Sequence, residues 1–176
     1  MSGQGENRGT ILDYPLPVFR FEVRFTVSAD HPGASGERLL CGGAFSECSG
    51  LEATMEPKAI KAGGRNYGEI QRAGRVSFST VILKRGVTRN RDLWKWFELV
   101  AKGAYAYRLK AEVTLFDFDV NGEKKPVMAW EMLNALPTKF KTADFNSTFT
   151  QAAIEELHFV HEGLIHKDNL EQETGE

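Results

Sequence analysis

The stretch from Val81 to Phe97 most constrains the fold of this chain, because it joins a strand pattern to a helix pattern through a short basic turn. Apolar and mostly β-branched residues at 81–83 predict a buried strand, and Gly86 supplies the turn. Apolar side chains then recur at helical spacing over about 90–102, and Gly103 is expected to end this helix. The stretch holds no chemically reactive group, which predicts packing and docking rather than catalysis. The apolar stripe consists of Leu93, Trp96, Phe97 and Val100.

Strand patterns dominate the rest of the chain. Between Phe19 and Val27, apolar residues alternate with charged or polar ones, which predicts a strand with one face in the core. Asn121-Gly122 indicates a hairpin. The glycine-rich segment 52–75 is too long for an ordinary turn, so we expect either a loop or an extended hairpin there. Further strands are predicted at 39–51, 76–84, 108–118, 127–136 and 152–161, with the last ending at Gly163.

These elements predict a mainly β fold, namely a small antiparallel β-barrel or β-sandwich with one packed α-helix at about 90–102. The length of 176 residues fits one domain. We expect a flexible N-terminus at 1–13, a single β domain at 14–165 and a polar, acidic C-terminal tail at 166–176. No apolar run approaches the ~18 residues of a membrane span. The formal net charge of −2 gives no overall attraction to nucleic acid or to an anionic membrane.

The two cysteines are expected to be free thiols. Cys41 and Cys48 lie an odd number of positions apart, so on one continuous strand their side chains would face opposite sides and could not pair.

The patterns that could carry chemistry are weak, and we expect no catalytic site, no metal and no other cofactor. Two histidines bracket the run HEGLIH at 161–166, but five positions apart on a helix they would point about 140° from each other. Asp117 and Asp119 share a strand face and fit the polar end of a hairpin better than an acid–base pair. The glycines of AGGRNYGE at 62–69 lack the lysine and the strand–helix turn of a phosphate loop.

Basic residues cluster in the long segment and around the turn before the helix, which leaves two interpretations open. They could form a nucleic-acid surface or a protein interface with matching acidic patches. With 24 acidic against 22 basic residues, the interface is favoured. Trp94 lies off the apolar stripe beside charged neighbours, which indicates either a covering loop or a subunit contact.

Eight sequence pieces, spread over 14–164, together resemble one family, the tail tube proteins of contractile-tailed phages and of phage-derived contractile injection systems. Their order and spacing carry the resemblance, and LKRG followed by LWKWF and the closing HEGL are the sharpest pieces. The pieces are FRFEV from Phe19, AFSECSGLE from Ala44, GGRN from Gly63, VILKRG from Val81, DLWKWF from Asp92, VTLFD from Val113, WEMLNALPTKF from Trp130 and AAIEELHFVHEGL from Ala152.

The resemblance implies a structural subunit and no enzyme. Members of that family form a small β-barrel or sandwich with one helix and assemble as hexameric rings that stack into a hollow inner tube. A contracting sheath drives the tube through a target envelope, and the lumen carries DNA or protein cargo. The partners implied are other copies of the chain, the sheath protein, the baseplate and spike, and tube-terminating proteins. Such a subunit is made in the bacterial cytoplasm and then belongs to a phage tail-like particle, which some systems release outside the cell. The alternative is a small β-barrel binding module for nucleic acid or a ligand.

Three sets of residues are expected to form the contacts of such a tube. The chain departs from the family just before the paired glycines, where family members usually have acidic residues and this chain has Lys61 and Ala62. We therefore expect the ring-to-ring contact to carry a different charge. The ring-to-ring candidates are Lys58, Lys61, Arg65, Asn66 and Tyr67. The intra-ring candidates are Arg85, Arg89 and Trp94. The lumen-facing candidates are Arg108, Lys110, Glu112 and Thr114.

Overall fold

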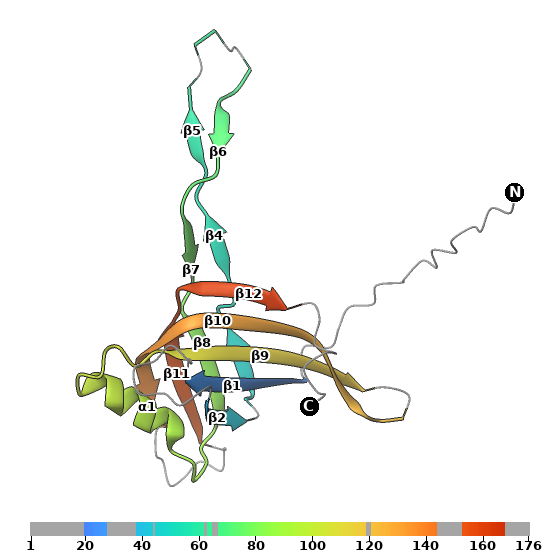
Figure 1. The fold of residues 1–176 in the computed structure, drawn as a ribbon, viewed down its shortest axis with the longest axis vertical. Coiled ribbons are helices and arrows are strands. Elements are labelled where there is room, and N and C mark those ends of the chain that lie inside the picture. The colour runs from blue at the N-terminus through green and yellow to red at the C-terminus, as the bar shows by residue number, and fades with distance from the viewer. Residues whose placement is uncertain are drawn as a thin grey trace, which may run out of the picture.

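The computed structural model describes residues 20–27, 38–43, 45–61, 63–64, 67–118, 121–143 and 153–167, with the backbone alone for 38–43. Strands and one helix build this part of the chain (Figure 1). The elements are β1 (Phe21–Val27), β2 (Arg38–Gly43), β3 (Glu47–Ser49), β4 (Ala53–Met55), β5 (Lys58–Ile60), β6 (Ile70–Arg72), β7 (Val76–Phe78), β8 (Val81–Gly86), α1 (Asp92–Ala101), β9 (Leu109–Phe118), β10 (Lys124–Lys141), β11 (Ile154–Val160) and β12 (Gly163–Lys167).

The body of the subunit is one antiparallel sheet that bends on itself. Its strand order is β2-β1-β9-β10-β11-β8-β3, and β12 also pairs with β10. Among the described strands, β2 and β3 stand at the two ends of this order and do not pair with each other, so the sheet stays open. The predicted mainly β class with one helix is confirmed, in its open and bent form rather than as a closed barrel.

The strand β10 makes the bend. Its first half pairs with β9 and β12, whereas Leu136 and the residues after it pair with β11. At the changeover, Asn134 has a φ of 54° and the register with β9 shifts between Met132 and Ala135. A single left-handed residue at a bulge sharpens the local turn of a strand. One strand therefore belongs to two layers, which enclose the core between them.

Alternating burial explains which side of each strand faces this core. In β1, Val23, Phe25 and Val27 are buried while the residues between them are not, as the sequence pattern predicts. Rings from distant segments meet at the centre: Phe25 lies 5.1 Å from Trp96 of α1 and 5.6 Å from Phe159 of β11, between ring centroids. The buried cluster is completed by residues of β8, β9, β10, β11 and the helix, among them Val81, Leu83, Leu93, Leu109, Ala111, Val113, Met132 and Leu157.

The helix α1 begins and ends close to where the sequence predicts. The Oδ1 atom of Asn90 accepts a hydrogen bond of 2.9 Å from the backbone N–H of Asp92, which satisfies one free donor of the first turn. Gly103 follows the helix with a φ of 113°, a value that favours glycine. The prediction that Gly103 ends the helix is confirmed.

The long segment 52–75 takes the second of its two expected forms. It is an extended hairpin, in which β4 pairs with β7 and β5 pairs with β6. We call residues 53–78 the arm, because Figure 1 shows this hairpin standing away from the body. The C-terminal end differs from the prediction: the chain does not leave the sheet at Gly163, since β12 continues to Lys167.

Candidate interaction surfaces

The arm presents apolar side chains to solvent. Its cross-strand pairs include Met55 with Val76 and Ile60 with Ile70, and all four side chains are exposed. Tyr67, near the tip, is 92% exposed. A two-stranded hairpin without a third layer is marginally stable in water. Exposed apolar pairs on such an element indicate a surface that another chain covers.

Three of the five predicted ring-to-ring residues lie on this arm in exposed positions, namely Lys58, Lys61 and Tyr67. Arg65 and Asn66 lie outside the described residues. Lys58 belongs to the outgoing strand β5 and Lys61 directly follows it, while Tyr67 lies on the return toward β6.

A histidine is buried where the arm joins the body. The ring of His161 lies 5.0 Å from that of Phe78, and its Nδ1–H donates a 2.9 Å hydrogen bond to the carbonyl of Gly163. Its Nε2 atom is buried and has no hydrogen-bond partner in the described part of the chain. Burial lowers the pKa of His161 from its ordinary 6.5, because desolvation disfavours the imidazolium form.

The outward side of β9 is polar, as the sequence predicts. Leu109, Ala111 and Val113 are buried, so the alternate positions Lys110, Glu112 and Thr114 share the opposite face. Arg108 precedes the strand, and its guanidinium lies 3.7 Å from a carboxylate oxygen of Glu162. The four predicted lumen-facing residues therefore sit together along one strand, although Thr114 is nearly covered by its neighbours.

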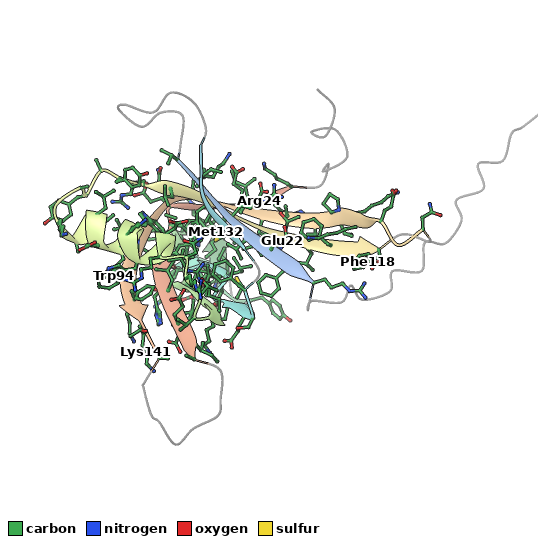
Figure 2. The ribbon with its side chains drawn as sticks, turned by 90° about the horizontal axis from the view of Figure 1, so that it is seen from below. Glu22, Arg24, Trp94, Phe118, Met132 and Lys141 are labelled. Atoms are coloured by element: carbon green, nitrogen blue, oxygen red, sulfur yellow. The ribbon has the colours of Figure 1, made fainter. Side chains whose placement is uncertain are left out.

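Neighbouring strands extend this polar face and balance its charge. The Lys167 ammonium of β12 lies 2.9 Å from Glu131 and 3.4 Å from Glu112, and Lys110 lies 3.8 Å from Glu131. Hydrogen bonding to Glu131 raises the pKa of Lys167 above its ordinary value. On β1, Arg24 pairs with Glu22 at 3.9 Å (Figure 2). Across β1, β9, β10 and β12, which we call the polar face, cations and anions neutralise each other.

Sequence reasoning missed Glu131 and Lys167. Glu131 stands between Trp130 and Met132 in an alternating pattern, which could have placed it opposite Glu112 had the pairing of β10 with β9 been known. Lys167 lay in the segment that the sequence assigned to the tail.

A hollow lies beside the start of the helix. It has a volume of about 420 Å³. Its floor is an ion pair between Arg85 and Glu155, whose side chains are 7% and 10% exposed. Arg85 also donates a hydrogen bond of 3.2 Å to the carbonyl of Asn90, so its guanidinium is engaged within the subunit. We call this cavity the hollow; it is lined by Arg85, Val87, Thr88, Asn90, Arg91, Trp94, Phe140, Thr142 and Glu155.

The three predicted intra-ring residues have different environments, and two of them, Arg85 and Trp94, line the hollow. Trp94 is 42% exposed and forms a wall, with its ring 5.3 Å from Phe140 and 5.9 Å from Phe97. Arg89 is exposed in the turn, whereas Arg85 lies buried beneath it. Trp94 and Arg89 are thus accessible to another chain, and Arg85 supports the turn that presents them.

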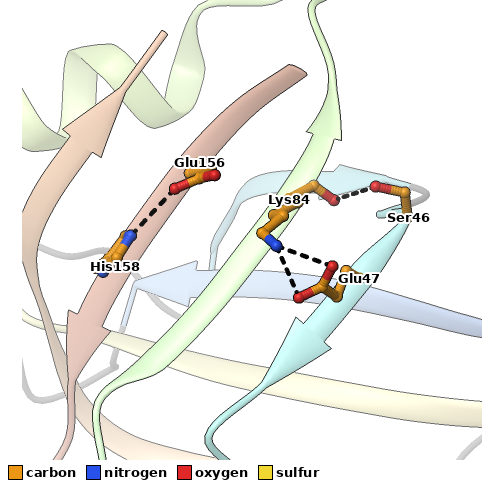
Figure 3. A network of polar contacts seen from close by, with 5 residues as sticks. All are labelled: Ser46, Glu47, Lys84, Glu156 and His158. Carbon is orange, nitrogen blue, oxygen red and sulfur yellow. Dashed lines mark hydrogen bonds and ion pairs between the residues drawn. The ribbon is translucent and has the colours of Figure 1, made fainter. Parts of the chain in front are cut away.

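The outer side of β8 and its neighbours carries a further polar network (Figure 3). The Lys84 ammonium lies 2.9 and 3.0 Å from the two carboxylate oxygens of Glu47, and this hydrogen bonding raises the pKa of Lys84. On the adjacent strand β11, His158 lies 3.5 Å from Glu156. The Ser46 hydroxyl donates a 3.0 Å hydrogen bond to the carbonyl of Lys84. The network ties β3 to β8 and contains no arrangement suited to catalysis.

Metal and membrane sites were sought over the same residues. Within the described ranges, no three His, Cys, Asp or Glu side chains are grouped closely enough to hold a metal ion. In that part of the structure no helix has the length and apolar character needed to cross a bilayer.

An open antiparallel sheet with a charge-balanced face, a projecting arm and one helix defines a structural subunit with surfaces suited to contact with other chains. Residues 17–165 match the model of the T4-like virus tail tube protein gp19 family, and the chain belongs to that family. The protein is an inner tube subunit of a phage tail or of a contractile injection system.

Solved structures agree with this fold. The chain is similar to a protein in the cryo-electron microscopy structure of the six-fold symmetrised anti-feeding prophage (AFP) baseplate, with 23% identity, a TM-score of 0.71, and 89% of this chain and 98% of that chain covered. It is also similar to a protein of the PVC sheath–tube complex of an extracellular contractile injection system, with 20% identity, a TM-score of 0.68, and 90% and 95% covered. No curated protein sequence matches the chain.

Proposed function

We propose that this subunit forms hexameric rings that stack head to tail into a hollow tube, with 14–165 as the assembling domain. The observation that carries the proposal is the arm, whose exposed apolar pairs have no use in an isolated subunit. Stacking through one arm per subunit is a heterologous contact, which repeats along an axis without limit. Six-fold symmetry is supported by the AFP baseplate, in which a protein of this fold occurs.

The arm is the proposed ring-to-ring element. Lys58, Lys61 and Tyr67 lie toward its exposed end, and Arg65 and Asn66 belong to the same segment in sequence. Covering the exposed pairs of Met55 with Val76 and Ile60 with Ile70 removes apolar surface from water. Each subunit thereby stabilises the arm of its neighbour as well as the stack.

The polar face is the proposed lumen wall. Its strands β1 and β9 turn apolar side chains to the core and polar ones outward, which suits a surface in contact with water. Its carboxylates and ammonium groups form close ion pairs, so a passing chain meets few unbalanced charges. Such a wall suits cargo of either charge, protein or DNA, that has to slide rather than bind.

The remaining partners follow from the tube itself. We propose that a sheath surrounds the tube, that a baseplate and spike begin it and that a terminating protein ends it. The similarity to proteins in AFP and PVC baseplate, sheath–tube and terminator structures supports these partners. The particle is assembled in the bacterial cytoplasm and acts outside the cell, as the extracellular nature of the PVC system supports.

Negative-stain electron microscopy of the purified chain, with and without a shortened arm, tests the proposal. Replacing 57–74 by Asn-Gly joins Glu56 to Arg75, whose backbones already share a 3.1 Å hydrogen bond, through a two-residue turn that suits a hairpin. The unmodified chain is expected to form six-fold rings and tubes, and the shortened chain rings that do not stack. A helix-surface variant, Glu98→Gln, is the matched control and should still form tubes. A monomer that assembles under no condition and shifts with an oligonucleotide would instead support a binding module.

A further inference from the structure

The hollow beside α1 is built to receive an apolar group from outside. Trp94 and Phe140 form one side and the exposed Val87 contributes to another. Beneath them, the Arg85–Glu155 ion pair already satisfies the charges of the floor. A cationic occupant would meet the exposed Arg91 of the lining as well as this satisfied pair, so its charge would stay unpaired, which is costly. A side chain with a large apolar surface fits the wall of Trp94 and Phe140 best.

The opposite part of the subunit presents such a group. Phe118 stands at the end of β9, in the hairpin between β9 and β10, and is 48% exposed. The Arg20 guanidinium lies 4.7 Å from the centroid of its ring, a cation–π contact that restrains the ring. Val127, across the same hairpin, is also exposed. We call Phe118 and Val127, at this end of the paired strands β9 and β10, the knob.

The knob and the hollow lie at opposite ends of the subunit. Figure 1 shows α1 at one end of the sheet and the β9–β10 hairpin at the other, and Figure 2 labels Trp94 and Phe118 at opposite ends of the subunit after a quarter turn. Complementary surfaces at opposite ends join copies head to tail, and such a contact gives a closed ring when its rotation closes. Two surfaces on one side would instead favour a symmetric dimer.

We propose that the knob of one copy inserts Phe118 into the hollow of the next copy around the ring. This inference rests on the proposed ring assembly and names the element that occupies the surface around Trp94. The hollow's volume of about 420 Å³ lies in the range that binding pockets use, so it has room for an aromatic ring together with a neighbouring side chain. Aromatic anchors in pockets carry a large share of the binding energy at such contacts.

Single variants of each surface test the contact in the full-length chain. Phe118→Ser removes the anchor, and Val87→Arg fills the hollow from an exposed position without altering the core. Each is expected to raise the protein concentration needed for ring formation by about tenfold or more, as read by analytical ultracentrifugation. The matched controls are Tyr105→Ser, an exposed aromatic outside the knob, and Leu99→Arg, an exposed position of α1 outside the hollow. Both controls should assemble like the unmodified chain.

A mixture of the two variants gives a sharper result. The Phe118→Ser copy keeps an intact hollow and the Val87→Arg copy keeps an intact knob, so the mixture can form one good contact per pair. Mixing is expected to give heterodimers that grow no further, because the outer ends of each pair are both defective. A symmetric contact, or a general loss of folding, produces no such limit.

The outcomes separate this inference from the ring proposal. If the unmodified chain forms rings and both variants do so at the same concentration, the knob contact is wrong while the ring stands. If mixing restores complete rings or gives no heterodimers, the knob contact is also wrong. If the unmodified chain forms neither rings nor tubes, both proposals fail together.

Discussion

Replacing Glu155 by alanine tests how strongly the buried ion pair beneath the hollow depends on both of its members. Glu155→Ala leaves the Arg85 guanidinium in a site where its side chain is only 7% exposed. Stranding one charge of a buried pair costs about 3–5 kcal/mol. Arg85 keeps its 3.2 Å hydrogen bond to the Asn90 carbonyl and lies 5.7 Å from the centroid of the Phe45 ring, so we expect a loss near the lower end, about 3 kcal/mol.

Urea unfolding of the dilute subunit, followed by tryptophan fluorescence, measures this loss. A urea dependence of about 1–3 kcal/mol per molar converts it into a midpoint lower by about 1–3 M. The control is Glu98→Ala, which removes a 2.8 Å ion pair to Lys102 on the exposed side of α1 and should cost only about 0.3–0.5 kcal/mol.

A second variant separates the stranded charge from the lost packing. Replacing both Arg85 and Glu155 by methionine removes the two charges together and should recover most of the stability that Glu155→Ala loses. If Glu155→Ala lies within about 1 kcal/mol of the unmodified protein, the pair is not desolvated as its burial implies and the reasoning is refuted. If the double variant is as unstable as the single one, packing rather than charge explains the loss.

Three further outcomes are expected. Gly50→Ala should lower the free energy of unfolding in urea by about 2 kcal/mol or more, because the φ of Gly50 is 86° and a Cβ there would lie 2.1 Å from the carbonyl oxygen of Thr80. Gly64→Ala is the control and should lose less, since Gly64 has a similar φ of 81° but open surroundings. Equal losses for the two variants would contradict the clash at Gly50. The stability of the folded chain should fall as the pH drops below about 6.5, because the pKa of His161 is lower in the folded state and the unfolded state therefore binds the proton more readily. His161→Gln should flatten this part of a plot of the urea midpoint against pH. Burial raises the pKa of Cys48 to about 11, which keeps its thiol protonated and unreactive at pH 8. In a variant with Cys41 replaced by serine, the folded chain should therefore react with a thiol reagent far more slowly than the chain unfolded in urea. Equal rates would show that the thiol is accessible in the folded state.

The sequence predicts best those elements whose pattern is local. The alternation around Phe25 and the stripe through Trp96 both report one buried side, and the structure buries those sides against each other. Periodicity reveals a buried side but carries no information about which strand lies alongside. The sequence therefore predicts the class of fold but not its open, bent form.

The strand β10 runs past both ends of the strand predicted at 127–136. It continues through Pro126 and Pro137, although proline lacks the backbone N–H of a ladder. In the structure the register shifts beside both prolines, between Pro126 and Met128 and between Pro137 and Lys139, so bulges let the strand continue through them. A bulge depends on the partner strand, which single-sequence patterns do not show.

Only part of the interaction surfaces could be predicted from the sequence, because the sequence pattern does not show which strands pair. Alternation along one strand predicts that Lys110 and Glu112 share a face. Glu131 forms an ion pair with Lys110 and lies opposite Glu112, which is known only once β9 and β10 are paired. Arg85 illustrates the reverse case: its basic neighbours suggested an exposed patch, yet Glu155 is placed beside it by the pairing of β11 with β8.

The pairing of the first strand with a late one implies an order of folding during synthesis. Phe21 of β1 pairs with Leu115 of β9, more than ninety positions later, whereas β10 and its partner β11 lie close together in the chain. Contacts between distant segments form slowly, because a long loop has to close first. A chain leaving the ribosome cannot complete its sheet until β9 and β10 have emerged. The knob and the polar face, both of which include β9, then arise late, which delays polymerisation until nearly the whole subunit has been made.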